Sequence, residues 1–173
     1  MPGPGRIIVH TGDGKGKTTA ALGTALRASG HGLKVAIVQF IKGDWNYGEA
    51  RALAACPNVE LTRIGSGFTW LADDPAEPRS LAREAWTVAK ETAMSDRYDL
   101  LILDELNCAL SEGYVTSGEV LAFLADKPGR LSVIITGRGA PEDLIEAADT
   151  VTEMRCIKHA FQHGAPARKG IEY

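Results

Sequence analysis

Short apolar runs alternate along the chain with longer segments in which apolar residues recur at helical spacing. The short runs are rich in valine, isoleucine and leucine, which is typical of strands buried on both faces. This alternation predicts an α/β fold, with a mostly parallel sheet of about six strands and helices on both faces. The expected strands are 7–9, 34–40, 59–64, 98–105, 131–136 and, at an edge of the sheet, 150–155; the expected helices are 18–28, 49–55, 78–94, 107–111, 118–125 and 141–148.

The first expected strand leads through a glycine-rich turn, 10–19, into the first expected helix. Glycines let backbone N–H groups point inward, and the helix N-terminus adds partial positive charge, so this arrangement makes a cradle for phosphate. Lys17 is placed to reach phosphate oxygens, and the Thr18 hydroxyl to ligate Mg²⁺. The turn is therefore interpreted as a phosphate-binding P-loop. The alternative is a glycine-rich turn with a solvated lysine.

The spacing of this turn departs from the usual P-loop pattern of glycine, four residues and Gly-Lys-Ser/Thr. Gly16, Lys17 and Thr18 match the second half of that pattern. Thr11 stands where the first glycine is expected, and Gly12 follows it. The turn is therefore interpreted as a P-loop variant.

The expected strand 98–105 carries four apolar residues and ends in Asp104 and Glu105. Such a strand is similar to the Walker B element of P-loop proteins, in which an acid holds Mg²⁺ directly or through water. The carboxyl ends of parallel strands meet at one edge of a sheet, so these acids are expected beside the P-loop. The alternative is a pair of acids that caps the next helix.

Three further segments follow strands or lie in loops where a ligand could bind. Lys42 comes after the second expected strand, and Arg138 stands between two glycines after the fifth. Both are candidates for contacts to phosphate or nucleotide; solvated loop charges are the alternative. Phe68 and Trp70 lie in a glycine-flanked loop, where they either anchor the loop to the core or form a wall for a flat apolar ligand.

The composition of the 173 residues is that of an ordinary globular chain, and one domain, 1–173, is expected. The net charge of −3 gives no indication of nucleic-acid binding, and no apolar run approaches a membrane span. The three cysteines are widely spaced and form no metal-binding pattern, which predicts reduced thiols in the cytoplasm.

Several short segments carry a more specific signal than the P-loop, above all Phe-Thr-Trp at 68–70 and Lys-His-Ala-Phe at 158–161. Together with the P-loop and the Asp-Glu pair, they resemble the P-loop family of corrinoid (cob(I)alamin and cob(I)yrinic acid a,c-diamide) adenosyltransferases. The resemblance runs from about Arg6 to Tyr173, in the same order and with similar spacing. The segments that carry it are 11–21, 38–43, 67–70, 103–105, 134–139, 158–161 and 170–173.

The resemblance implies a RecA-like P-loop fold and a reaction. Enzymes of this family transfer the 5′-deoxyadenosyl group of ATP to Co(I) of a reduced corrinoid and release triphosphate. The metal is the nucleophile, so no general base is required. The loop and Mg²⁺, with Mn²⁺ as a substitute, would neutralise the charge that develops on the leaving triphosphate.

Site roles follow from the same resemblance. Lys17, Phe68 and Trp70 are expected to be catalytic, the two aromatic residues by facing the corrin and displacing the lower axial ligand of Co(II). Thr18 and Glu105 are expected to contact Mg²⁺, with Asp104 one layer further from the metal. The residues expected to bind ATP are Gly12, Asp13, Gly14, Lys15, Gly16, Lys17, Thr18, Thr19, Lys42 and Arg138.

The implied partners are ATP, a corrinoid, a reduced flavoprotein that donates an electron, and a second copy of the chain in a homodimer. The corrinoid is left open among cobalamin, cobinamide and cobyrinic acid a,c-diamide. Two other functions are also open: a small P-loop kinase or ATPase, which would release ADP, and a regulatory module that binds nucleotide without turnover.

Overall fold

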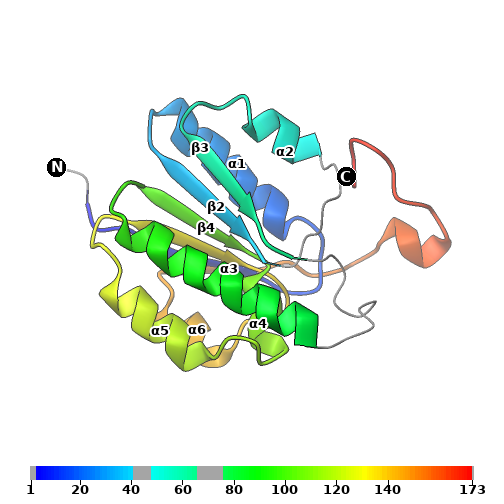
Figure 1. The fold of residues 1–173 in the computed structure, drawn as a ribbon. Coiled ribbons are helices and arrows are strands. Elements are labelled where there is room, and N and C mark those ends of the chain that lie inside the picture. The colour runs from blue at the N-terminus through cyan, green and yellow to red at the C-terminus, as the bar shows by residue number, and fades with distance from the viewer. Residues whose placement is uncertain (1–2, 41–47, 66–75, 173) are drawn as a thin grey trace.

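Six parallel strands form one sheet at the centre of the computed structural model, which describes residues 3–40, 48–65 and 76–172 (Figure 1). The strand order is β3-β2-β4-β5-β1-β6, and every neighbouring pair is parallel. The strands are β1 (Ile7–Thr11), β2 (Val35–Gln39), β3 (Val59–Arg63), β4 (Leu100–Asp104), β5 (Ser132–Thr136) and β6 (Thr150–Glu153). The predicted α/β class is confirmed, and β6 lies at an edge as expected.

Helices cover both faces of this sheet, which also confirms the prediction. They are α1 (Lys17–Gly30), α2 (Gly48–Leu53), α3 (Ala76–Met94), α4 (Leu106–Ser111), α5 (Ser117–Asp126) and α6 (Glu142–Ala147), followed by a short 3₁₀ helix, η2 (Ala160–His163). The expected boundaries differ from these by a few residues at most. The start of α3 is one example, because Pro78 was expected to begin the helix and instead lies in its first turn. A proline is tolerated there, since the first N–H groups of a helix have no partner within it.

Alternate residues of the central strands divide between two apolar clusters. Leu101, Leu103, Val133 and Ile135 pack with α3, α4, α5 and α6 on one face. Ile102 and Ile134 pack with α1 and α2 on the other. Residues on both faces are buried, which explains why the strands read as continuous apolar runs.

Alanines form much of the contact between helix and sheet. The buried apolar residues of α1 are Ala21, Ala25 and Ala28, and α3 buries Ala82, Ala85, Ala89 and Ala93. Small side chains let these helices lie close to the strands. Because α1 begins at Lys17, the packing of α1 against the sheet determines how far the preceding loop lies from the strands.

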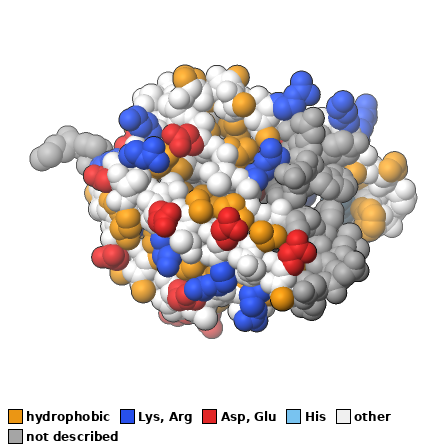
Figure 2. Space-filling view, in the orientation of Figure 1, with side chains coloured by type: hydrophobic (Ala, Val, Ile, Leu, Met, Phe, Trp, Pro, Cys, Tyr) orange, Lys and Arg blue, Asp and Glu red, His pale blue; other side chains and the backbone are white. Residues whose placement is uncertain are grey.

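The surface over α3 and α5 is charged and mixed in sign (Figure 2). Arg83 of α3 and Glu119 of α5 form an ion pair there, with Nη1 and Oε1 separated by 2.8 Å. Within the described ranges, no helix has the length and apolar character that crossing a membrane would require.

The strand order places β5 between β1, which precedes the glycine-rich turn, and β4, which ends in Asp104. The carboxyl ends of all these strands lie at one edge of the sheet, since the sheet is parallel. Residues from β2, β4, β5 and the start of α1 are thereby brought together, although they are far apart in sequence.

Candidate functional site

The glycine-rich turn between β1 and α1 is a tight loop whose backbone needs glycine at two positions. Gly12 has φ of 90° and Gly16 has φ of 118°, both in the region that residues with a side chain rarely adopt. A Cβ at Gly12 would lie 2.5 Å from the carbonyl oxygen of Met154. Gly12 is therefore required where it stands, one position later than in the usual pattern. Thr11, which precedes it, is the last residue of β1, and its hydroxyl accepts a hydrogen bond from the N–H of Ala140.

The ammonium group of Lys17 lies inside this loop. Its Nζ donates to the carbonyl oxygens of Gly12 at 2.6 Å and Gly14 at 2.7 Å, and the residue is 7% exposed. Burial lowers the pKa of Lys17, and the nearby Glu105 carboxylate opposes that effect. The loop carbonyls thus fix a cation at the N-terminus of α1, where an anion binds favourably.

Asp104 is the centre of a buried hydrogen-bond network at the end of β4. Its side chain is fully buried and accepts from three elements: the hydroxyl of Thr18 on α1 at 2.8 Å, the hydroxyl of Thr136 on β5 at 2.7 Å, and the amide of Gln39 on β2 at 2.9 Å. The three donors give both oxygens of this buried carboxylate a hydrogen-bond partner. The structure therefore brings Thr18 and Asp104 together, as the sequence predicted.

The sequence reasoning missed Gln39 and Thr136 as members of the site. Both are polar residues at the ends of otherwise apolar strands, and both are buried. A polar residue at the carboxyl end of a buried strand was the signal available to find them.

Glu105 follows in a left-handed conformation, with φ of 66°, and begins the turn into α4. Its backbone N–H donates to the Thr136 hydroxyl at 3.0 Å. Its carboxylate accepts from the thiol of Cys108 at 2.9 Å. Burial, and then the Glu105 carboxylate, raise the pKa of Cys108 to about 12, so this thiol stays protonated and remains a donor.

Most of the other predicted site residues are exposed or lie outside the described part of the chain. Asp13, Thr19 and Arg138 are exposed, and Arg138 is near enough to Lys17 and Cys108 to affect the pKa of each. The Lys15 side chain lies away from Lys17 and contacts the C-terminal residues Ile171 and Glu172. Lys42, Phe68 and Trp70 lie outside the described residues.

The oxygen groups near the loop fit a divalent cation of the magnesium type. Hydroxyl and carboxylate oxygens are the ligands that Mg²⁺ prefers, and it usually takes only one or two from the protein when it is bound with phosphates. Thr18, Asp104 and Glu105 supply such groups. The described residues contain no cluster of three His, Cys, Asp or Glu side chains that could hold a metal by itself.

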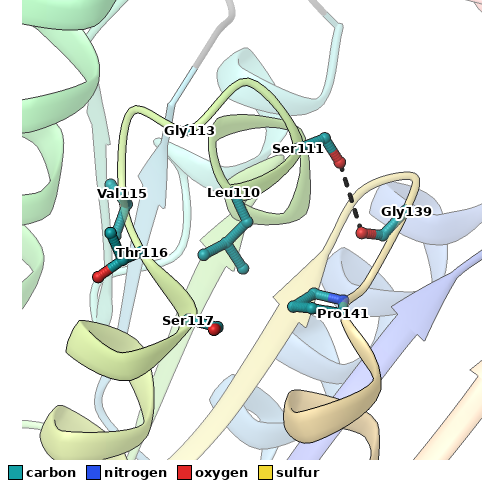
Figure 3. A pocket seen from close by; sticks show the side chains of 8 residues that line it. All are labelled: Leu110, Ser111, Gly113, Val115, Thr116, Ser117, Gly139 and Pro141. Atoms are coloured by element: carbon teal, nitrogen blue, oxygen red, sulfur yellow. Dashed lines mark hydrogen bonds between the residues drawn. The ribbon is translucent and has the colours of Figure 1, made fainter.

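A shallow pocket of about 270 Å³ lies next to this site, between the end of α4 and the loop that follows β5 (Figure 3). Leu110 points into it, and the Ser111 hydroxyl donates to the carbonyl oxygen of Gly139 across one side at 3.4 Å. Its remaining walls come from Gly113, Val115, Thr116, Ser117 and Pro141. None of the predicted site residues lines this pocket.

Comparison with solved structures gives the fold. The chain resembles the ATPase EscN of the enteropathogenic Escherichia coli type III secretion system, with a TM-score of 0.51 and 18% identity, over 87% of this chain and 42% of that one. At this identity the likeness concerns the fold alone. It supports the predicted P-loop architecture.

Comparison with known sequences gives the family. The profile of ATP:corrinoid adenosyltransferase BtuR/CobO/CobP matches residues 4–173. A corrinoid adenosyltransferase of Escherichia coli K12 is 47% identical over 98% of this chain and 86% of its own length. One from Pseudomonas aeruginosa is 45% identical over 98% of this chain and 84% of its own. The chain belongs to the ATP:corrinoid adenosyltransferase family.

Proposed function

We propose that the described site binds the triphosphate of ATP so that the adenosyl group can be transferred to the cobalt of a corrinoid. In this reaction the electron pair of Co(I) forms a bond to C5′ of the ribose. The bond between C5′ and its oxygen breaks, and the electron pair leaves with triphosphate. No proton has to move, so the reaction needs no general base.

The observation that carries this proposal is the position of Lys17. Its buried ammonium is held by two loop carbonyls at the N-terminus of α1. A cation fixed there can stabilise negative charge without reorganising as that charge develops on the leaving group. The loop N–H groups act in the same direction, so the loop favours departure of the whole triphosphate.

Thr18 and Glu105 would hold Mg²⁺, with Asp104 fixing the Thr18 hydroxyl. When bound, the ion would neutralise charge on the triphosphate. Mn²⁺ has similar ligand preferences and is expected to replace it. The proposal rests on the oxygen groups that surround Thr18, and on the hydrogen bonds that hold the Asp104 side chain in place.

Phe68 and Trp70 complete the proposal as the apolar wall that faces the corrin. The proposed corrinoid substrate is cobalamin, cobinamide or cobyrinic acid a,c-diamide. Reduction of Co(II) to Co(I) needs one electron, for which we propose a reduced cytoplasmic flavoprotein. A homodimer is also proposed, and it is supported by the large apolar side chains of Ile157 and Phe161, which are 85% and 78% exposed.

An anaerobic assay with ATP, Mg²⁺ and chemically reduced Co(I) corrinoid tests the reaction. We expect a light-sensitive alkyl-cobalt spectrum together with triphosphate. Release of ADP and phosphate without an alkyl-cobalt product would contradict the proposal and favour a kinase or ATPase. Bound ATP that stays intact would favour a regulatory module.

Trp70→Ala tests the apolar wall. We expect it to slow the reaction that starts from Co(II) and a reductase far more than the reaction that starts from Co(I). Equal losses in the two assays would assign Trp70 to packing. A conservative variant, Trp70→Phe, should retain most of the activity from Co(II).

A further inference from the structure

The C-terminal segment, defined here as residues 154–172, leaves the end of β6 and turns back toward the sheet after η2 (Figure 1). Nearly all of its side chains are exposed. It nevertheless contacts the P-loop near both of its own ends. At its beginning, the N–H of Gly14 donates to the carbonyl oxygen of Met154 at 2.6 Å.

At its other end, the C-terminal segment contacts Lys15. The Lys15 ammonium lies 3.3 Å from Oε1 of Glu172 and 3.4 Å from the carbonyl oxygen of Ile171. These residues are more than 150 positions apart in sequence. The contact therefore depends on the folded segment and not on local chain geometry.

The Glu172 carboxylate is itself held in place by the backbone. The N–H of Arg168 donates to its Oε2 at 2.8 Å, and the N–H of Glu172 donates to the carbonyl oxygen of Arg168 at 2.9 Å. The hydrogen bond from Arg168, and then the one from Lys15, lower the pKa of Glu172. The carboxylate is thus a fixed negative group that faces one lysine of the loop.

The two lysines of the loop have different surroundings. Lys17 is buried on loop carbonyls, whereas the Lys15 side chain is 47% exposed and turned to the C-terminal segment. Glu172 consequently does not occupy the interior of the loop, and its ion pair with Lys15 need not break when an anion binds beside Lys17. The segment instead holds the outer side of the loop at Gly14 and Lys15.

We propose that the C-terminal segment holds the P-loop in its phosphate-binding conformation, with Glu172 as a positioning residue that acts through Lys15. The proposal rests on ATP binding by the P-loop, as given above. Docking of the segment and binding of the triphosphate then favour each other, and by linkage each strengthens the other to the same degree.

Affinity for ATP and for inorganic tripolyphosphate, measured by calorimetry, tests the direction of this coupling. In Glu172→Gln we expect both ligands to bind about two- to fivefold more weakly, the range for loss of an exposed ion pair. The difference from wild type should fall as salt is raised, because exposed charges are screened. The matched control is Glu146→Gln, an exposed acid on α6.

Steady-state kinetics with Co(I) separates positioning from general damage. We expect KM for ATP to rise in Glu172→Gln while kcat stays as in wild type. Tighter ATP binding in this variant would show that Glu172 competes with phosphate, and unchanged binding would show no coupling. Either result overturns the proposal.

Trypsin provides a readout that does not depend on activity. In wild type, cleavage after Arg168 and Lys169 should be slow, and tripolyphosphate should slow it further. In Glu172→Gln, cleavage should be fast, and tripolyphosphate should not change its rate. Lys15→Gln removes the other half of the ion pair and leaves the bond from the Arg168 N–H to Glu172 in place, so it should also speed cleavage in the absence of ligand. Cleavage in Glu172→Gln or in Lys15→Gln that is as slow as in wild type overturns docking through this pair. Wild-type protein that binds no ATP would instead contradict the proposed function.

Discussion

The P-loop is held from two sides by contacts of opposite character. On the inside, the Thr18 hydroxyl is bonded to Asp104, which is fully buried and shared with Gln39 and Thr136. On the outside, Lys15 meets Glu172 of the C-terminal segment at the surface. The inner contact joins α1 to the three strands β2, β4 and β5, whereas the outer one joins the loop to a segment with little burial of its own.

The difference in burial determines how strong each contact is and how it responds to salt. A buried carboxylate with three donors cannot lose them without leaving polar groups unsatisfied, so the inner contact is expected to be strong and insensitive to salt. An exposed ion pair contributes little and is screened. The inner contact therefore determines whether the loop forms at all, and the outer one adjusts how well it binds.

Removal of the Asp104 side chain breaks the inner contact and should have the largest effect on the free energy of unfolding. Asp104→Ala leaves three donors without their acceptor, and we expect the free energy of unfolding to fall by about 3 kcal/mol, since each unsatisfied buried group costs about 1–3 kcal/mol. Urea denaturation measures this loss. Asp104→Asn should lose less, and Glu84→Ala, which removes an exposed acid on α3, should be nearly neutral. A loss in Asp104→Ala no larger than in Glu84→Ala would contradict the described network.

Removal of the Lys17 ammonium should separate binding from folding. In Lys17→Ala we expect ATP to bind about a hundredfold more weakly, because charge-assisted hydrogen bonds contribute about 1.5–3 kcal/mol each. Calorimetry measures the affinity. Lys34→Ala, which removes an exposed lysine just before β2, serves as the control. Wild-type affinity in Lys17→Ala would remove the P-loop interpretation.

A methyl group at Gly14 should disturb the loop between its inner and outer contacts. The added Cβ would lie 2.7 Å from the carbonyl carbon and oxygen of Met154, so the loop or the end of β6 must shift. We expect ATP affinity to fall by about tenfold, an effect of about 1–2 kcal/mol that is typical of forced overpacking. The control is Gly23→Ala on α1, where an added Cβ meets nothing. If both variants bind ATP equally well, the close approach of the loop to Met154 has no consequence for binding.

The ion pair between Arg83 and Glu119 lies away from the loop and serves as a reference for the exposed contact of Lys15 with Glu172. Its removal is expected to have the smallest effect of the four changes. The backbone N–H of Thr116, and then Arg83, lower the pKa of Glu119 to about 2. A lowered pKa means that this stabilisation is complete above the unfolded-state value of about 4.5 and is lost as pH falls toward 2.

Glu119→Gln should therefore reduce stability by about 0.5–1 kcal/mol at pH 7, as expected for a helix cap, and by almost nothing at pH 2. Urea denaturation at the two pH values measures the difference, and ATP affinity should stay unchanged. A larger effect at low pH would show that the sign of this linkage is wrong.

The sequence was sufficient to predict the elements that local patterns encode. The apolar runs gave the strands, and the adjacent Gly16, Lys17 and Thr18 gave the loop and the start of α1. Asp104 was predictable because it follows a buried strand directly. Its contact with Thr18 then followed from the parallel sheet, where carboxyl ends meet at one edge.

The partners that complete the site could not be predicted in this way. Gln39 and Thr136 reach Asp104 because β2 and β5 are the neighbours of β4, and strand order is a property of the whole fold. The contact of Lys15 with Glu172 depends on the path of a segment with no regular period. The sequence shows that Gly12 stands one position later than the usual pattern, and only the close approach of Met154 gives the physical reason for its place.

The buried alanines of α1 have a consequence for how this protein tolerates substitutions. Ala21, Ala25 and Ala28 are buried against the sheet, and the loop that holds Lys17 is continuous with the helix they support. A larger side chain at any of these positions would lift the helix and carry the loop with it. Nucleotide affinity should therefore depend on packing at positions that do not contact the phosphates. Random mutagenesis screened for loss of ATP binding should identify substitutions at these alanines as well as at the loop residues.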